Sequence, residues 1–125
     1  MKENLEMFSL KGKTAVITGG AGILGSAIAR GLGKAGARIA LCDLVNADKV
    51  AKQLQSEGIE TKGYYLDVMD IEKIKSCRDE VIKDFGKVDI LLNAAGGNMK
   101  EATTSEELKF FDLPHTEITL YKFYL

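Results

Sequence analysis

The residues best suited to chemistry form a glycine-rich segment, residues 18–25, with the sequence T-G-G-A-G-I-L-G. Its glycines match the pattern G-x-G-x-x-G between an expected strand and an expected helix. Such a turn needs glycine to bend the chain, to let a pyrophosphate approach the backbone and to pack helix against strand. The N–H groups that begin the helix then face the phosphates. The alternative is a tight turn without a ligand; the candidate binding residues are Gly19, Gly20, Gly22, Ile23, Leu24 and Gly25.

Asp43 provides a second signal, at the expected end of the second strand and 18 residues after Gly25. An acid at this place accepts hydrogen bonds from the adenosine ribose hydroxyls. Its charge repels a 2′-phosphate, and no arginine or lysine lies in the glycine-rich segment or directly after Asp43 to attract one. The pattern therefore favours NAD over NADP. The alternative is that Asp43 only caps the next helix.

Two later segments complete a resemblance to the short-chain dehydrogenase/reductase family over residues 8–114. Leu66-Asp67-Val68 resembles the acidic motif of that family's third strand, and residues 89–96 (D-I-L-L-N-A-A-G) resemble its N-N-A-G segment. The resemblance implies that Asp67 and Val68 contact the adenine and that Asn93 steadies the central sheet. It also implies that the backbone of Ala94, Ala95 and Gly96 passes under the adenosine ribose. The implied partners are NAD, a small carbonyl or alcohol substrate and, for the whole protein, further copies of itself.

Two positions depart from the family pattern. The single-domain branch would place a glycine at Ile23, whereas Gly22 gives the spacing of the extended branch of sugar-nucleotide epimerases and dehydratases. The N-A-A-G segment nevertheless favours the single-domain branch, and we interpret Ala94 as a subgroup feature. The motifs G-G-A-G-I-L-G and A-A-G-G-N, with residues 102–104 and 110–114, resemble members described as D-mannonate oxidoreductases (fructuronate reductases). That likeness implies hydride transfer from NADH to the keto group of a hexuronate.

The catalytic residues of the family are a serine and a Tyr-x-x-x-Lys pair, in which the lysine lowers the pKa of the tyrosine that transfers the proton. No tyrosine of this chain has a lysine four residues later; the tyrosines are Tyr64, Tyr65, Tyr121 and Tyr124. We therefore expect the 125-residue chain alone to be inactive. Three functions stay open: an NAD-dependent oxidoreductase present as an incomplete chain, a non-catalytic nucleotide-binding fragment, and an NAD-dependent epimerase or dehydratase.

Alternating apolar runs and glycine stops predict the elements that position these residues. Strands are expected at 13–18, 38–42, 60–66 and 88–92, with helices after the glycine-rich segment, at 46–57 and from Asp70 to Phe85. Gly36, Gly58 and Gly86 are expected to end the helices. The predicted inner faces are Leu24, Ile28, Leu32 and Ala35; Ala47, Val50, Ala51 and Leu54; and Ile71, Ile74, Val81 and Phe85.

This β-α-β-α-β-α-β order predicts an α/β fold, the first half of a Rossmann-type doubly wound parallel sheet, although barrels share such alternation. We expect an N-terminal extension at 1–9, the nucleotide-binding half-domain at 10–97, an excursion loop at 98–114 and an atypical tail at 115–125. The tail, which holds the bystander His115, resembles either a frameshifted end or a deliberate cut. In a chain that ends there, the apolar fourth strand would keep an uncovered face.

Composition excludes several classes of function. A net charge of −1 gives no basic face for nucleic acid. Cys42 and Cys77 lack C-x-x-C spacing and a nearby histidine, so we expect buried, reduced thiols and no metal site, with a disulfide as the alternative. The N-terminus lacks the apolar run of a secretory signal, and no stretch reaches membrane-spanning length, so we expect a cytoplasmic protein without a membrane partner.

Overall fold

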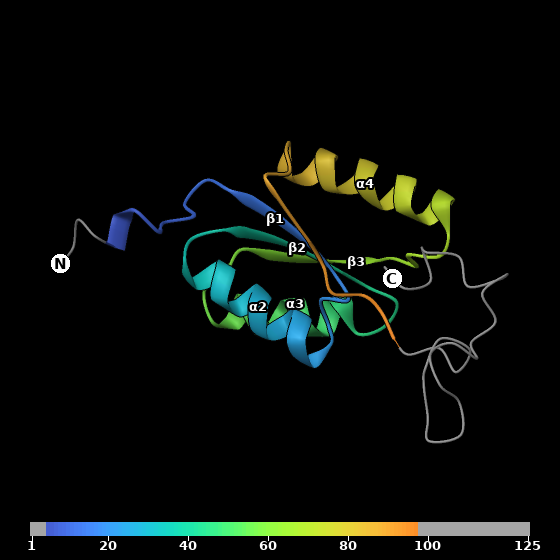
Figure 1. Cartoon of the computed structure of the whole chain (residues 1–125), viewed down its shortest axis with the longest axis horizontal. Coiled ribbons are helices and arrows are strands. Elements are labelled where there is room, and N and C mark those ends of the chain that lie inside the picture. The colour runs from blue at the N-terminus through green and yellow to red at the C-terminus, as the bar shows by residue number, and fades with distance from the viewer. Residues whose placement is uncertain (1–4, 98–125) are drawn as a thin grey trace, which may run out of the picture. The chain divides into compact units, whose positions relative to one another are not determined.

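The computed structural model describes residues 5–97 as seven alternating strands and helices (Figure 1). In chain order they are β1 (Thr14–Thr18), α2 (Ile23–Lys34), β2 (Arg38–Asp43), α3 (Ala47–Ser56), β3 (Thr61–Tyr65), α4 (Ile71–Phe85) and β4 (Ile90–Asn93). The predicted alternation is confirmed, and each bound lies close to the expected one. The predicted excursion loop and tail lie outside the described residues.

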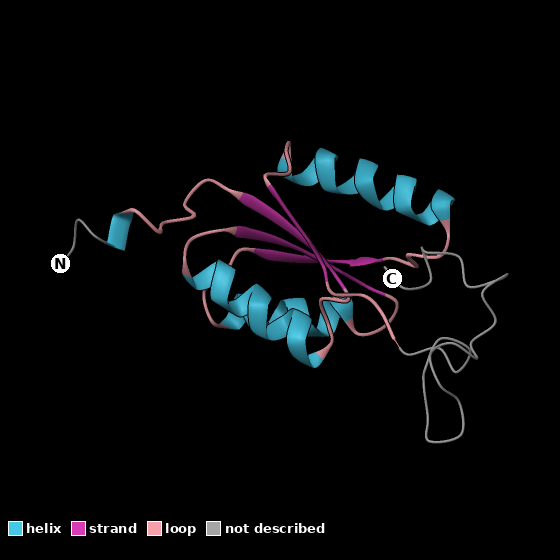
Figure 2. Cartoon of the chain, viewed as in Figure 1, coloured by secondary structure: helices cyan, strands magenta, loops and turns pink. Residues whose placement is uncertain are grey.

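The four strands form one parallel sheet in the order β3-β2-β1-β4. Helices α2 and α3 cover one face of the sheet and α4 covers the other (Figure 2). This arrangement confirms the predicted Rossmann-type, doubly wound fold. The strand order reverses at β1, because β2 and β4 flank it on opposite sides. In open parallel sheets, ligands bind beyond the carboxyl ends of the strands at such a reversal.

The central strand β2 contributes to two apolar cores because its side chains alternate between the faces of the sheet. On the α2–α3 side, Ile39 and Leu41 are fully buried together with Ile17, Ala29 and Leu54. On the α4 side, Ala40 and Cys42 pack with Tyr64, Leu66, Cys77, Val81 and Phe85. Burial on both faces explains why this strand is a continuous apolar run.

The buried faces of two helices differ from the predicted ones. In α2, Leu24 is 68% exposed, and Gly25 and Ala29 face the core instead. Small residues take this face because α2 begins against the glycine-rich loop, where a larger side chain would not fit. In α4, Ile71 is 67% and Ile74 42% exposed, and Cys77 joins Val81 and Phe85 in the core. The inner face predicted for α3 is confirmed, with Ala47, Ala51 and Leu54 buried and Val50 partly buried.

Strand β4 lies at the edge of the described sheet, next to β1. Ile90 and Leu92 pack against the core on the α2–α3 side, whereas Leu91, which points to the other face, is 61% exposed. The entry to β4 is fixed to β1 by Asp89, whose carboxylate accepts a hydrogen bond of 2.8 Å from the Thr14 N–H. Within residues 5–97, β4 therefore shows the uncovered apolar face that the sequence suggested.

Asp70 is the N-cap residue of α4, and its contribution to the stability of the fold can be tested by substitution. Its carboxylate accepts hydrogen bonds from the Glu72 and Lys73 N–H groups at 2.9 and 3.2 Å. Replacement by alanine leaves both donors without this partner, so Asp70→Ala is expected to lower the free energy of unfolding by about 1 kcal/mol. Urea denaturation measures the change. Asp79→Ala, which removes an exposed acid from the middle of α4, serves as the control, and an equal loss in both variants would contradict the capping role.

Candidate nucleotide-binding site

The glycine-rich loop follows β1 and lies against the chain that leaves β4. Gly19 has a φ of 64°, in the left-handed region that favours glycine. A Cβ atom at Gly19 would lie 2.6 Å from the Ala95 nitrogen and 2.7 Å from the Ala94 carbonyl group. Two segments far apart in the sequence thus meet backbone to backbone. The predicted site residues Gly19, Ala94 and Ala95 are brought together by this contact.

The start of α2 packs equally closely on the loop. A Cβ atom at Gly25 would overlap the carbonyl oxygen of Gly19, and one at Gly20 would lie 2.7 Å from the Leu41 side chain. Gly22, the N-cap residue of α2, is less confined, because its Cβ would lie 3.3 Å from the Gly19 oxygen and meet nothing else within 4 Å. Gly19, Gly20 and Gly25 therefore have steric reasons to be glycine that are independent of any ligand.

The N-terminus of α2 offers the donors that an anion needs. No side chain caps it, and its first turn contains no acid. The first N–H groups of a helix have no partner within the helix, and the helix dipole makes this end partly positive. Ile23 and Leu24 flank the helix start and are 95% and 68% exposed. Accessible backbone N–H groups of this kind are suited to bind the pyrophosphate of a dinucleotide.

Asp43 lies beside this loop at the end of β2. Its carboxylate accepts hydrogen bonds from the Ala21 N–H at 3.0 Å and the Val45 N–H at 3.3 Å. One residue earlier, the Cys42 carbonyl accepts a hydrogen bond from the Gly20 N–H at 3.0 Å. The alternative role for Asp43 as a cap of α3 is wrong, because the N-cap of that helix is Asn46. These bonds fix the acid against the glycine-rich loop.

Asp67 and Val68 follow β3 at the same edge of the sheet. The Leu66 N–H donates to the Asp43 carbonyl at 3.0 Å, which places the ends of β2 and β3 side by side. The Asp67 carboxylate accepts a hydrogen bond from the Met69 N–H at 2.9 Å and shapes the turn before α4. Val68 is partly buried against the core on the α4 side. Contact of Asp67 and Val68 with an adenine stays a prediction.

Asn93 ends β4 and contacts Thr18, the last residue of β1. The Thr18 hydroxyl lies 3.3 Å from the Asn93 Oδ1 atom, to which it donates, and 3.4 Å from the Ala95 nitrogen. The Thr18 carbonyl accepts a hydrogen bond from the Ala94 N–H at 3.0 Å. Sequence reasoning missed Thr18, although it is the first residue of the glycine-rich segment. Gly96 lies outside the compact unit that ends at Ala95, so it is not placed relative to this site.

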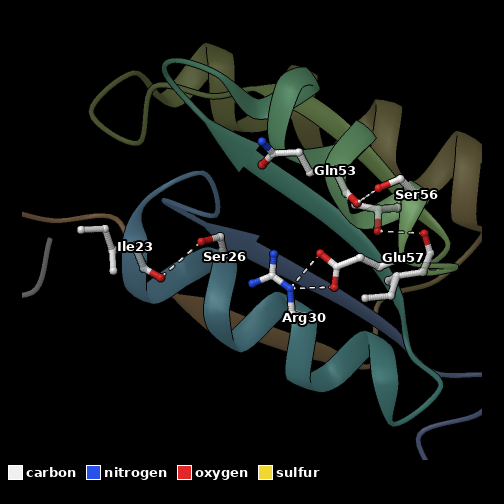
Figure 3. A network of polar contacts seen from close by, with 8 residues as sticks. Ile23, Ser26, Arg30, Gln53, Ser56 and Glu57 are labelled. Atoms are coloured by element: carbon white, nitrogen blue, oxygen red, sulfur yellow. Dashed lines mark hydrogen bonds and ion pairs between the residues drawn. The ribbon is translucent and has the colours of Figure 1, made fainter.

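A polar network on α2 and α3 supports the helix that begins at the loop (Figure 3). The Ser26 hydroxyl donates to the Ile23 carbonyl at 3.2 Å, within the first turn of α2. Farther along, Arg30 pairs with Glu57, which follows α3, at 2.8 Å. The guanidinium lowers the pKa of the Glu57 carboxyl from its usual value. The pair is partly exposed, so it orients the two helices more than it stabilises the fold.

Comparison with known proteins identifies the family. The family model described as short chain dehydrogenase matches residues 13–118. The chain belongs to the short-chain dehydrogenase family. An uncharacterised oxidoreductase of Haemophilus influenzae is 44% identical over 90% of this chain and 40% of its own length. D-threitol dehydrogenase of Mycolicibacterium smegmatis is 38% identical over 87% of this chain and 42% of its own length.

A similar solved structure agrees with this assignment. The structure of a candidate D-mannonate oxidoreductase from Haemophilus influenza, with bound NAD, has a TM-score of 0.73 and 38% sequence identity. The matched region covers 90% of the present chain and 44% of the chain in that solved structure. The likeness to the family and to relatives described as D-mannonate oxidoreductases, inferred from the motifs, is confirmed. The chain spans about two fifths of the length of the curated relatives described above.

Two further observations concern other kinds of site. Among residues 5–97, no three histidine, cysteine or acidic side chains lie close enough together to hold a metal ion. In the same part of the chain, no helix has the length and apolar character needed to cross a membrane.

Proposed function

We propose that this chain carries the NAD-binding residues of a short-chain oxidoreductase that transfers a hydride between nicotinamide and a small carbonyl or alcohol substrate. The observation that carries the proposal is the uncapped N-terminus of α2 beside the fixed Asp43 carboxylate, at the point where the strand order reverses. Donors for a pyrophosphate and an acceptor for a ribose lie on either side of one loop. When bound, NAD supplies the site that accepts or gives the hydride.

The residues of the loop divide the binding between them. The backbone N–H groups of the first turn of α2, from Ile23 to Gly25, hold the pyrophosphate. Gly19 and Gly20 give the loop its close path over β1, and the exposed Ile23 and Leu24 line the cofactor beside the helix start. No charged side chain is needed for this task, because the donors belong to the backbone and the helix dipole is favourable.

Asp43 selects the nicotinamide cofactor in this proposal. Two backbone N–H groups hold its carboxylate, and the oxygens retain lone pairs for the ribose hydroxyls. A 2′-phosphate at the same place would meet a negative charge, so we propose NAD as the cofactor rather than NADP. Asp67 and Val68 lie at the adenine, and Ala94 and Ala95 pass under the ribose. Asn93 keeps β4 in register with β1 through Thr18.

The names of the relatives support a polyhydroxylated substrate for the whole protein. They include a D-threitol dehydrogenase and a candidate D-mannonate oxidoreductase. We propose a hexuronate or its alcohol, such as the fructuronate–mannonate pair, and a cytoplasmic homo-oligomer. The chain studied alone is expected to show no turnover, because none of its tyrosines belongs to a Tyr-x-x-x-Lys motif.

Titration calorimetry with NAD and NADP tests the proposal directly. The folded chain is expected to bind NAD saturably and more tightly than NADP, and a rise in thermal midpoint with NAD concentration gives an independent readout. NADH oxidation with fructuronate is expected to stay at the background rate in the same preparation. A folded chain that binds neither dinucleotide, or binds both equally, would overturn the proposed function. Hydride transfer by this chain would show that other residues replace the missing tyrosine and lysine.

A further inference from the structure

Two cysteines from different elements meet beneath α4. Cys42 lies on β2 and faces α4, and Cys77 lies on the inner face of α4. Their Sγ atoms are 3.6 Å apart, although 35 positions separate them in the sequence. Both thiols are free, and their residues are 0% and 6% exposed. Neither side chain belongs to the candidate nucleotide-binding site.

The surroundings of the pair favour chemistry between the two sulfurs over metal binding. The neighbours in this core are apolar or aromatic, among them Ala40, Leu66 and Val81. A structural zinc ion takes four ligands, and the described residues offer no third metal-ligating side chain close to the two thiols. A disulfide needs the sulfurs to approach from 3.6 Å to about 2.0 Å.

The two thiols also differ in reactivity. The two thiols share a hydrogen bond in which either sulfur can be the donor. With Cys42 as the donor, this bond lowers the pKa of the Cys77 thiol. The same bond, together with burial, raises the pKa of the Cys42 thiol. The thiolate is the nucleophile in thiol oxidation, so the sulfur of Cys77 is the one that reacts first. Cys77 is also the residue of the pair that keeps some exposure to solvent.

We propose that Cys42 and Cys77 form a reversible intramolecular disulfide, with hydrogen peroxide as the oxidant, that ties α4 to the central strand β2. The Cys77 thiolate attacks one peroxide oxygen, the O–O bond breaks, and the departing hydroxide takes a proton to become water. Cys77 is then a sulfenic acid. The Cys42 sulfur displaces its hydroxyl group, which leaves as a second water when it takes the Cys42 proton. Two thiols lose two electrons, and peroxide gains them.

The disulfide would add a covalent link between β2 and α4, which the fold joins by packing and by a hydrogen bond of 2.9 Å from the Arg38 guanidinium to the Phe85 carbonyl. It would close a loop that contains α3, β3 and the first turns of α4, and such a closure restricts the unfolded chain. Because the sulfurs are already in contact, the folded chain needs little rearrangement. We therefore expect the oxidised chain to unfold at a higher temperature than the reduced chain, and a dithiol reductant to reverse the change.

The test treats the folded wild-type chain with hydrogen peroxide and follows intact mass, free thiols and thermal unfolding. The expected result is a monomer that has lost two hydrogen atoms and both free thiols, with Cys42 and Cys77 joined in a non-reduced peptide map. Its unfolding midpoint is higher, and dithiothreitol restores the original mass and midpoint. Cys42→Ser and Cys77→Ser are the matched controls, in which the two-hydrogen loss within one chain is impossible.

Three results would overturn the disulfide. The first is a wild-type chain that keeps both thiols at peroxide concentrations that oxidise free cysteine, while its circular dichroism spectrum shows that it is folded. The second is cross-linking between chains instead of within one chain. The third is an oxidised chain with a lower unfolding midpoint, because the bond would then form only by breaking the packing of α4 on β2. All three measurements use the wild-type chain, so they stay decisive even where a serine variant fails to fold.

Discussion

Gly25→Ala is expected to abolish measurable NAD binding at concentrations that saturate the wild-type chain. The added methyl group would overlap the Gly19 carbonyl oxygen, so the loop has to move away from the start of α2. Loss of two phosphate hydrogen bonds, each worth about 1.5 kcal/mol, corresponds to an affinity about 100-fold lower. Overpacking at this contact is also expected to lower the free energy of unfolding by about 2 kcal/mol.

Gly31→Ala is the matched control because it makes the same chemical change in the same helix. Gly31 lies in the middle of α2 on its solvent-exposed side, and a Cβ atom there would meet nothing within 4 Å. Alanine is the better helix former, so this variant is expected to gain about 0.5–1 kcal/mol of stability with NAD binding unchanged. Calorimetry and urea denaturation of both variants check the pair. If Gly25→Ala bound NAD with wild-type affinity, the loop could move away from α2 without loss of binding. The argument that a Cβ atom at this position disrupts the site would then be wrong.

Asp43→Asn is expected to change which cofactor the chain prefers. The variant keeps the size of the side chain but loses its charge, so the ribose hydroxyls lose charge-assisted hydrogen bonds worth about 1.5–3 kcal/mol. The dissociation constant for NAD is expected to rise about 10-fold to 100-fold. Affinity for NADP is expected to fall less or to rise, because the repulsion of the 2′-phosphate disappears. The measured quantity is the ratio of the NAD and NADP dissociation constants.

Part of the Asp43 effect acts through the loop itself. An amide has one acceptor oxygen, so the Ala21 and Val45 N–H groups can no longer both be satisfied as they are by the carboxylate. Asp48→Asn separates this local role from a general loss of charge, since Asp48 is an exposed acid in the first turn of α3. It is expected to leave the NAD-to-NADP ratio unchanged. An unchanged ratio in Asp43→Asn as well would show that cofactor choice does not depend on this carboxylate.

The sequence predicted those features of the fold that depend on one local property, such as backbone conformation or apolar character. The glycine stops are an example: Gly36, Gly58 and Gly86 all adopt positive φ values, which side chains with a Cβ rarely do. The continuous apolar run of β2 likewise required burial on both faces. The order of strands and helices followed from such signals, and the handedness of parallel crossovers limited the fold to very few candidates. The family likeness rested on motif spacing that the chain carries in its sequence.

The faces of α2 and α4 show where local pattern was insufficient. Leu24 and Ile74 have the right spacing for an inner face, yet both are exposed. The rotation of a helix on a sheet is set by the closest contacts that neighbouring segments allow. One such contact for α2 is Gly25 against the Gly19 carbonyl oxygen, and one for α4 is the hydrogen bond of 2.6 Å from the Tyr64 hydroxyl on β3 to the Asp84 carboxylate. Both contacts join residues whose proximity exists only after folding.

By itself, the sequence determined the alternation of elements, the parallel sheet, the glycine-rich loop and the acid at the end of the second strand. Each of these depends on residue type and short-range spacing, because backbone conformation and burial act over a few residues. Only the tertiary structure decided that Asp43 binds Ala21 rather than capping α3, that Thr18 joins β1 to Asn93 on β4, and that Cys42 meets Cys77. These contacts connect distant positions through the strand order β3-β2-β1-β4, which brings their elements together in space.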